Sequence, residues 1–144
     1  MTETDALQTT LAAEHAAVFV YGALGGRTSQ AATPELFAAV SAAYTAHRAR
    51  RDLLTRQIAD LAAQPVAAEP AYELQRRLET PDQVARAALD LERSCATTYA
   101  YLVANTVEEQ RRWAISALNE AAVRELVFRG TPETFPGSDE YADR

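Results

Sequence analysis

A glutamate in the middle of an otherwise apolar helical stripe constrains the fold of this chain more than any other residue. Positions spaced alternately by four and three residues lie on one face of an α-helix. Near the N-terminus these positions hold Leu7, Leu11, Glu14, Val18, Tyr21 and Gly25. The apolar members predict that this face packs inward. A carboxylate there is costly to bury unless it is paired, hydrogen-bonded or bound to metal, so the rest of the chain must supply a partner for Glu14.

Composition indicates one helical domain. A chain of 144 residues, 48% hydrophobic and 24% charged, fits a single domain with one core. Five glycines and six prolines interrupt it, few enough to favour helix. The formal net charge of −6 opposes binding to nucleic acid or to an anionic membrane surface. Because the sequence has neither a membrane-length apolar run nor a signal-peptide pattern, we expect a cytoplasmic protein that binds neither nucleic acid nor membrane.

Caps, prolines and glycines divide the chain into four long helices. The expected ranges are 4–24, 34–63, 81–104 and 107–130. Thr80 and Thr106 each open a capping box, with Gln83 and Glu109 three residues later. No strand-like alternation appears between these segments. The sequence therefore predicts an all-α fold.

The connections between the helices predict how they are arranged. Two short connections make two antiparallel hairpins, whereas residues 64–80, with Pro65 and Pro70, form a segment long enough to return along a bundle. The third helix then runs parallel to the second, in the ferritin-like arrangement of two hairpins joined by a long crossover. We expect this antiparallel four-helix bundle to occupy residues 1–130. The acidic tail, 131–144, is expected to pack on the bundle or to extend from it.

The two hairpins also resemble each other in sequence. The first helix of each holds a glutamate followed seven residues later by a tyrosine, and the second holds a polar residue followed four residues later by an arginine. A duplicated hairpin would place these polar side chains at one level of the core. The side chains expected to meet there are Glu14, His47, Arg51, Glu92, Glu120 and Arg124. Such a centre is either a hydrogen-bonded structural network or a metal site.

These features resemble an actinobacterial ferritin-like domain family of unknown function. The residues that carry the resemblance are Glu14-His15, His47-Arg48-Ala49-Arg50-Arg51-Asp52, Glu92, Ala121-Ala122-Val123-Arg124 and Phe135-Pro136-Gly137. The resemblance covers most of the chain and implies a fold but no activity. Di-iron members of the superfamily take one glutamate from each of two helices and a Glu-x-x-His from each of the other two. Glu14 and Glu92 match the first role, but no Glu-x-x-His is present, so the six-ligand set falls to about four.

Charge counting favours a centre without metal. The three carboxylates are balanced by two arginines and a protonated His47. An arginine near each ligand would repel a divalent cation, and its planar guanidinium suits carboxylates. We therefore expect a non-catalytic structural or interaction module without a cofactor. The alternative is an iron- or manganese-binding redox protein that uses the ligands Glu14, His47, Glu92 and Glu120.

The remaining polar and aromatic candidates are expected to lie in the core or beside it. These residues, none of which we expect to be a ligand, are His15, Tyr21, Tyr44, Cys95 and Tyr99. Arg48 and Arg50 are expected to point away from the centre when Arg51 points inward. The single cysteine, Cys95, excludes an internal disulfide.

The surface suggests self-association. Alanine-rich helices leave shallow apolar faces, and ferritin-like bundles often pair through their first two helices. We therefore expect a homodimer, and the sequence names no other protein partner.

Overall fold

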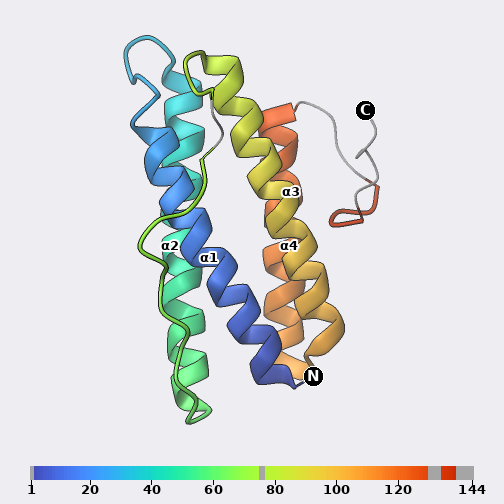
Figure 1. Ribbon diagram of the computed structural model, residues 1–144. Coiled ribbons are helices and arrows are strands. Elements are labelled where there is room, and N and C mark those ends of the chain that lie inside the picture. Colours follow the sequence, from blue (N-terminus) through green and yellow to red (C-terminus); the bar gives the residue numbers. More distant parts are fainter. Residues whose placement is uncertain (1, 75–76, 130–133, 139–144) are drawn as a thin grey trace.

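The computed structural model describes residues 2–74, 77–129 and 134–138, which contain four α-helices and no strand (Figure 1). The helices are α1 (Glu3–Gly25), α2 (Pro34–Asp60), α3 (Pro81–Asn105) and α4 (Glu108–Arg129). The all-α prediction is confirmed. Gly130, expected to end the last helix, and most of the acidic tail lie outside the described residues. None of the described helices combines the length and the apolar character that a membrane span requires.

The two expected capping boxes have different outcomes. At the start of α3, Thr80 Oγ1 accepts a hydrogen bond from Gln83 N at 3.3 Å, and Gln83 Oε1 accepts one from Thr80 N at 3.2 Å. The Thr106 hydroxyl instead donates to the backbone oxygen of Leu102 at 2.7 Å. Thr106 therefore ends α3. The predicted box with Glu109 is wrong, because Glu108, which the box would place in the first helical turn, has a φ of 48° and the helix begins only there.

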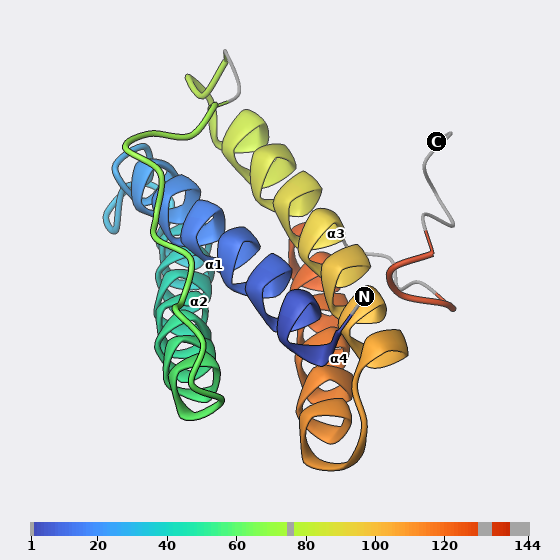
Figure 2. The same ribbon diagram turned by 60° about the horizontal axis from the view of Figure 1, so that its bottom comes forward.

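The segment between α2 and α3 runs beside α1 and in the same direction (Figures 1 and 2). Val66 N donates to Gln8 Oε1 at 2.8 Å, and His15 Nε2 lies 3.1 Å from Val66 O. Further along, the rings of Phe19 and Tyr72 have centroids 5.5 Å apart. The chain thus returns along the hairpin of α1 and α2, so α3 starts at the same end as α2 and runs parallel to it.

The four helices do not enclose the core equally. α1 packs on α2 and on α3, and α3 packs on α4, whereas α2 and α4 make little contact with each other. In Figure 2 these two helices stand apart on the side away from α1. A cavity of about 170 Å³, lined by Ala39, Ala42 and Val127 among others, lies between them. We call the side between α2 and α4 the open side.

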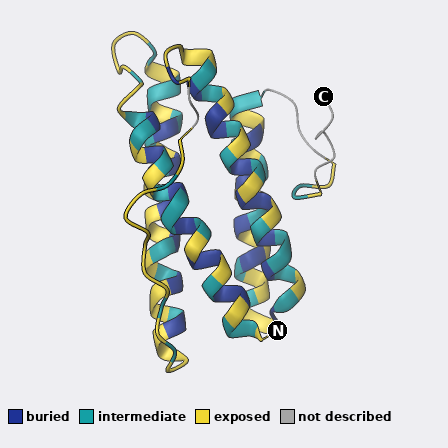
Figure 3. Ribbon diagram, viewed as in Figure 1, coloured by how far each residue is buried: buried dark blue, intermediate teal, exposed yellow. Residues whose placement is uncertain are grey.

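The buried residues lie along the inner faces of the helices (Figure 3). Apolar clusters occupy both ends of the bundle, and buried polar residues lie between them. Leu24 and Val84 belong to the cluster at one end, and Leu7 and Ile58 to the cluster at the other. All four are fully buried. Glu14, which interrupts the apolar face of α1, lies between these clusters and is 1% exposed. Its burial confirms the inward face that the spacing predicts.

The contribution of the α3 capping box to stability can be tested by substitution. Replacing Thr80 by Ala should lower the free energy of unfolding by about 1 kcal/mol, because the N–H of Gln83 loses its acceptor. Thr80→Ser keeps the hydroxyl and should cost much less. Urea unfolding followed by circular dichroism measures both. Equal losses in the two variants would contradict the role of the hydroxyl.

Candidate functional site

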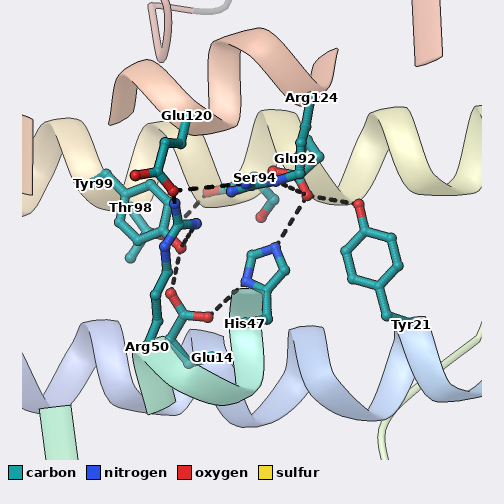
Figure 4. Close-up of polar contacts among 10 residues, drawn as sticks. All are labelled: Glu14, Tyr21, His47, Arg50, Glu92, Ser94, Thr98, Tyr99, Glu120 and Arg124. Atoms are coloured by element: carbon teal, nitrogen blue, oxygen red, sulfur yellow. Dashed lines mark hydrogen bonds and ion pairs between the residues drawn. The ribbon is translucent and has the colours of Figure 1, made fainter. Parts of the chain in front are cut away.

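Polar side chains from all four helices meet at the middle of the bundle (Figure 4). Of the six expected residues, the structure brings together Glu14, His47, Glu92, Glu120 and Arg124. Arg51 is not among them, because its guanidinium pairs with the neighbouring Asp52 at 2.7 Å. Arg50 takes the place that was expected for Arg51. We call Glu14, His47, Arg50, Glu92, Glu120 and Arg124 the ion network.

His47 joins two buried carboxylates. Its Nδ1 lies 2.6 Å from Glu14 Oε2 and its Nε2 lies 3.0 Å from Glu92 Oε1. Burial alone would lower the pKa of His47, but the hydrogen bonds and charges of Glu14 and Glu92 raise it above its ordinary value. Each ring nitrogen therefore carries a proton and donates it to a carboxylate. The ring is an imidazolium that links α2 to α1 and to α3.

Glu92 gathers three donors on one oxygen. Its Oε1 accepts hydrogen bonds from the Tyr21 hydroxyl at 2.6 Å, His47 Nε2 at 3.0 Å and Arg124 Nε at 2.9 Å. Burial would raise the pKa of Glu92, but the hydrogen bond from His47 and the charge of Arg124 outweigh it and lower the pKa. The carboxylate is therefore ionised, and its charge is shared by contacts from three helices.

Two tyrosines connect the hairpins in a reciprocal way. Tyr21 follows Glu14 by seven residues on α1 and donates to Glu92 of α3. Tyr99 follows Glu92 by seven residues on α3 and donates to Glu14 of α1. Burial raises the pKa of both hydroxyls, so both remain protonated donors. The expectation that these tyrosines are core residues with satisfied hydroxyls is confirmed.

Arg50 extends the ion network to α4. Its Nη1 donates to the Tyr99 hydroxyl at 2.9 Å, its Nη2 donates to Glu120 Oε2 at 2.5 Å, and its guanidinium lies 5.0 Å from the centre of the Tyr99 ring. Arg50 is 6% exposed, whereas the Glu120 side chain is 56% exposed. Glu120 therefore closes the ion network at the open side and is not buried inside it.

The expectation of a buried Glu120 is wrong because α4 is rotated toward α3. Its buried residues are Ala114, Ala117, Ala121 and Glu125. Glu125 is a buried carboxylate that the sequence analysis missed, and its Oε2 lies 3.6 Å from Arg129 Nη1. The four-residue steps from Ala117 through Ala121 to Glu125 are the sequence pattern that could have identified it.

The expectation of an inward Arg51 is also wrong. Arg50 and Arg51 are both flanked by His47 and Leu54, at helical spacings of three and four residues. Spacing alone therefore cannot choose between them. The choice depends on where the acceptors lie, and Tyr99 and Glu120 both lie on the Arg50 side.

The remaining candidates lie outside the ion network. His15 contacts the returning segment, and Tyr44 is half-buried, 5.6 Å from the guanidinium of Arg48. Cys95 is buried, and burial raises the pKa of its thiol. Among the described residues, no group of three or more His, Cys, Asp or Glu side chains is arranged to hold a metal ion. In formal charge, three carboxylates meet two guanidinium groups and one imidazolium, so the network is neutral as it stands.

Neighbouring arginines provide a matched test of this geometry. Arg50→Leu should lower the free energy of unfolding by about 1–3 kcal/mol, because the buried Tyr99 hydroxyl loses a charged donor and Glu120 loses its nearest cation. Arg51→Leu should cost about 0–1 kcal/mol, because its pair with Asp52 is partly exposed. Chemical unfolding measures both. Equal losses, or a larger loss for Arg51→Leu, would contradict the assignment.

The His47 imidazolium predicts how stability depends on pH. Because folding raises the pKa of His47 above 6.5, its stabilisation is complete below that pH and is lost as pH rises through the raised value. Glu92 acts in the opposite sense, since its pKa is lowered from 4.5 and its stabilisation is lost as pH falls. The free energy of unfolding should therefore be greatest between these values and should decline above pH 6.5. In urea unfolding series, His47→Gln should remove the alkaline decline and His15→Gln should keep it; the reverse result would refute this role.

Comparisons with known proteins agree with this fold. A family model described as a domain of unknown function, DUF4439, matches residues 6–140. The crystal structure of a conserved hypothetical protein, rv2844, from Mycobacterium tuberculosis is similar with a TM-score of 0.79 and 27% identity, over 88% of this chain and 87% of that one. No curated protein matches. Since the family model spans nearly the whole chain, the protein belongs to the DUF4439 family of unknown function.

Proposed function

We propose that the protein is a ferritin-like bundle in which an ion network stands where di-iron proteins hold their metals, and that it works as a non-catalytic structural or interaction module. Two hairpins with a long return segment and parallel α2 and α3 support the ferritin-like assignment. Glu14 on α1 and Glu92 on α3 face each other across the core, as the single glutamates of a di-iron centre do.

The position of His47 carries the proposal. Its ring lies between Glu14 and Glu92 and donates to both, so a cation already fills the space between the two carboxylates. A metal ligand must be a neutral imidazole with a free nitrogen, and here both nitrogens face acceptors. Arg124 adds a second cation on Glu92. The residues present therefore do not fit a di-metal centre.

A metal-binding redox protein is the alternative. Its ligands would be Glu14, His47, Glu92 and Glu120, and it would require His47 to lose a proton while Arg50 and Arg124 leave their carboxylates. The buried Glu92 Oε2, which accepts no hydrogen bond within the described part of the chain, is the one atom that favours it. One free oxygen is far short of a ligand set, so the ion network is the better-supported reading.

Metal analysis separates the two functions. Protein produced with added iron or manganese should contain well below one metal ion per chain, and a chelator should leave its melting temperature unchanged, since the network is neutral without metal. Near-stoichiometric metal that disappears in Glu92→Gln would overturn the proposal. Arg124→Gln serves as the control, because removing a cation should not lower the affinity of a true metal site.

A further inference from the structure

The outer face of α4 carries a patch of exposed apolar side chains. The exposed fractions are 43% for Ile115, 59% for Val123, 38% for Leu126 and 60% for Val127. Their spacing of eight, three and one residues keeps all four on one side of the helix. Single exposed apolar residues are ordinary, but four on one side of a helix make that side a candidate for an interaction surface. We call this surface the α4 face.

The shape of the α4 face suits another helix. Ser116, Asn119 and Val123 line a hollow of about 290 Å³. Next to it, on the open side, small residues of α2 such as Ala39 and Ala42 border the cavity toward Val127. Small side chains at a contact allow two helices to approach closely, with the larger side chains of one filling the hollows of the other. The surface can thus receive a helix with protruding valine and isoleucine side chains.

The charges of the α4 face are self-complementary. Arg112 and Glu120 are both exposed and lie two turns apart, on either side of Ser116. In an antiparallel pair of identical helices centred between Ser116 and Asn119, Arg112 lies level with Val123 of the second copy. Glu120 of that copy is then three residues away along the axis, about 4.5 Å at 1.5 Å per residue. An arginine side chain spans that distance, so two symmetric ion pairs can form.

We propose that two copies of this chain pair through their α4 faces, antiparallel, with Ile115 of each copy near Val123 of the other. The pairing rests on the proposed interaction role and names the partner as a second copy. It also gives Glu120 a third cation, Arg112 of the second copy, beside Arg50 and Arg124 of its own chain. The ion network itself is complete in one chain, so metal analysis and measurement of mass test the two proposals separately.

Mass measurement tests the pairing. Analytical ultracentrifugation of the full chain at tens of micromolar should give twice the mass of one chain. Ile115→Asp should shift the protein to monomer, with a dissociation constant at least about tenfold higher, because Ile115 lies level with Glu120 of the second copy, where the aspartate loses water and meets a like charge. Val107→Asp is the control: Val107 is 54% exposed but lies just before α4 and off the face. Circular dichroism verifies that both variants are folded.

Two adjacent arginines test the register. Arg112→Glu should weaken the dimer by about tenfold or more, because it sets like charges against each other across the axis. Arg111→Glu changes the same charge on an exposed neighbour that lies on the opposite side of the helix from Glu120, and it should weaken the dimer much less. A monomeric wild-type chain would overturn the proposal. A dimer that survives Ile115→Asp, as one formed through α1 and α2 would, overturns it too, and so does a dimer lost equally in the control variants.

Discussion

The imidazolium of His47 is the contact on which the centre of this bundle depends. Its two N–H groups reach carboxylates on two other helices, and without it Glu14 and Glu92 would face each other in a buried space. Two like charges there are costly unless a cation separates them. The same contact also helps to attach α2 to the other helices. α2 packs most extensively on α1, and the bonds of His47 and Arg50 join it to the second hairpin beside the apolar clusters that it shares with α3 and α4.

Much of this fold could be predicted because its determinants are local. The capping box at Thr80 and the two prolines of the return segment are readable within a few residues, and they place the helices and the crossover. The repeated glutamate and tyrosine of α1 and α3 also predicted inward groups, since a duplicated hairpin repeats its burial. Their reciprocal hydrogen bonds, Tyr21 to Glu92 and Tyr99 to Glu14, follow from the same internal symmetry.

The parts that could not be predicted depend on how helices rotate against each other. The internal repeat breaks at the arginines: the inward arginine follows His47 by three residues on α2 but follows Glu120 by four on α4. Aligning the hairpins therefore favoured Arg51 over Arg50. The exposure of Glu120 also depends on helix rotation. The buried alanines of α4 face α3, and this orientation leaves Glu120 at the open side. No periodicity within one helix contains that information.

The open side links the ion network to the surface. Between α2 and α4 an ion pair runs from Arg50 to Glu120 beside the apolar clusters that both helices share, and Glu120 remains 56% exposed to water. Covering this side would remove water from the pair and strengthen its Coulomb attraction, but it would also cost Glu120 its hydration. A covering surface must therefore bring a cation of its own. In the proposed pair, Arg112 of the second copy supplies that cation to Glu120, so a residue that contacts Arg50 in its own chain but stays half exposed couples pairing to the centre of the fold.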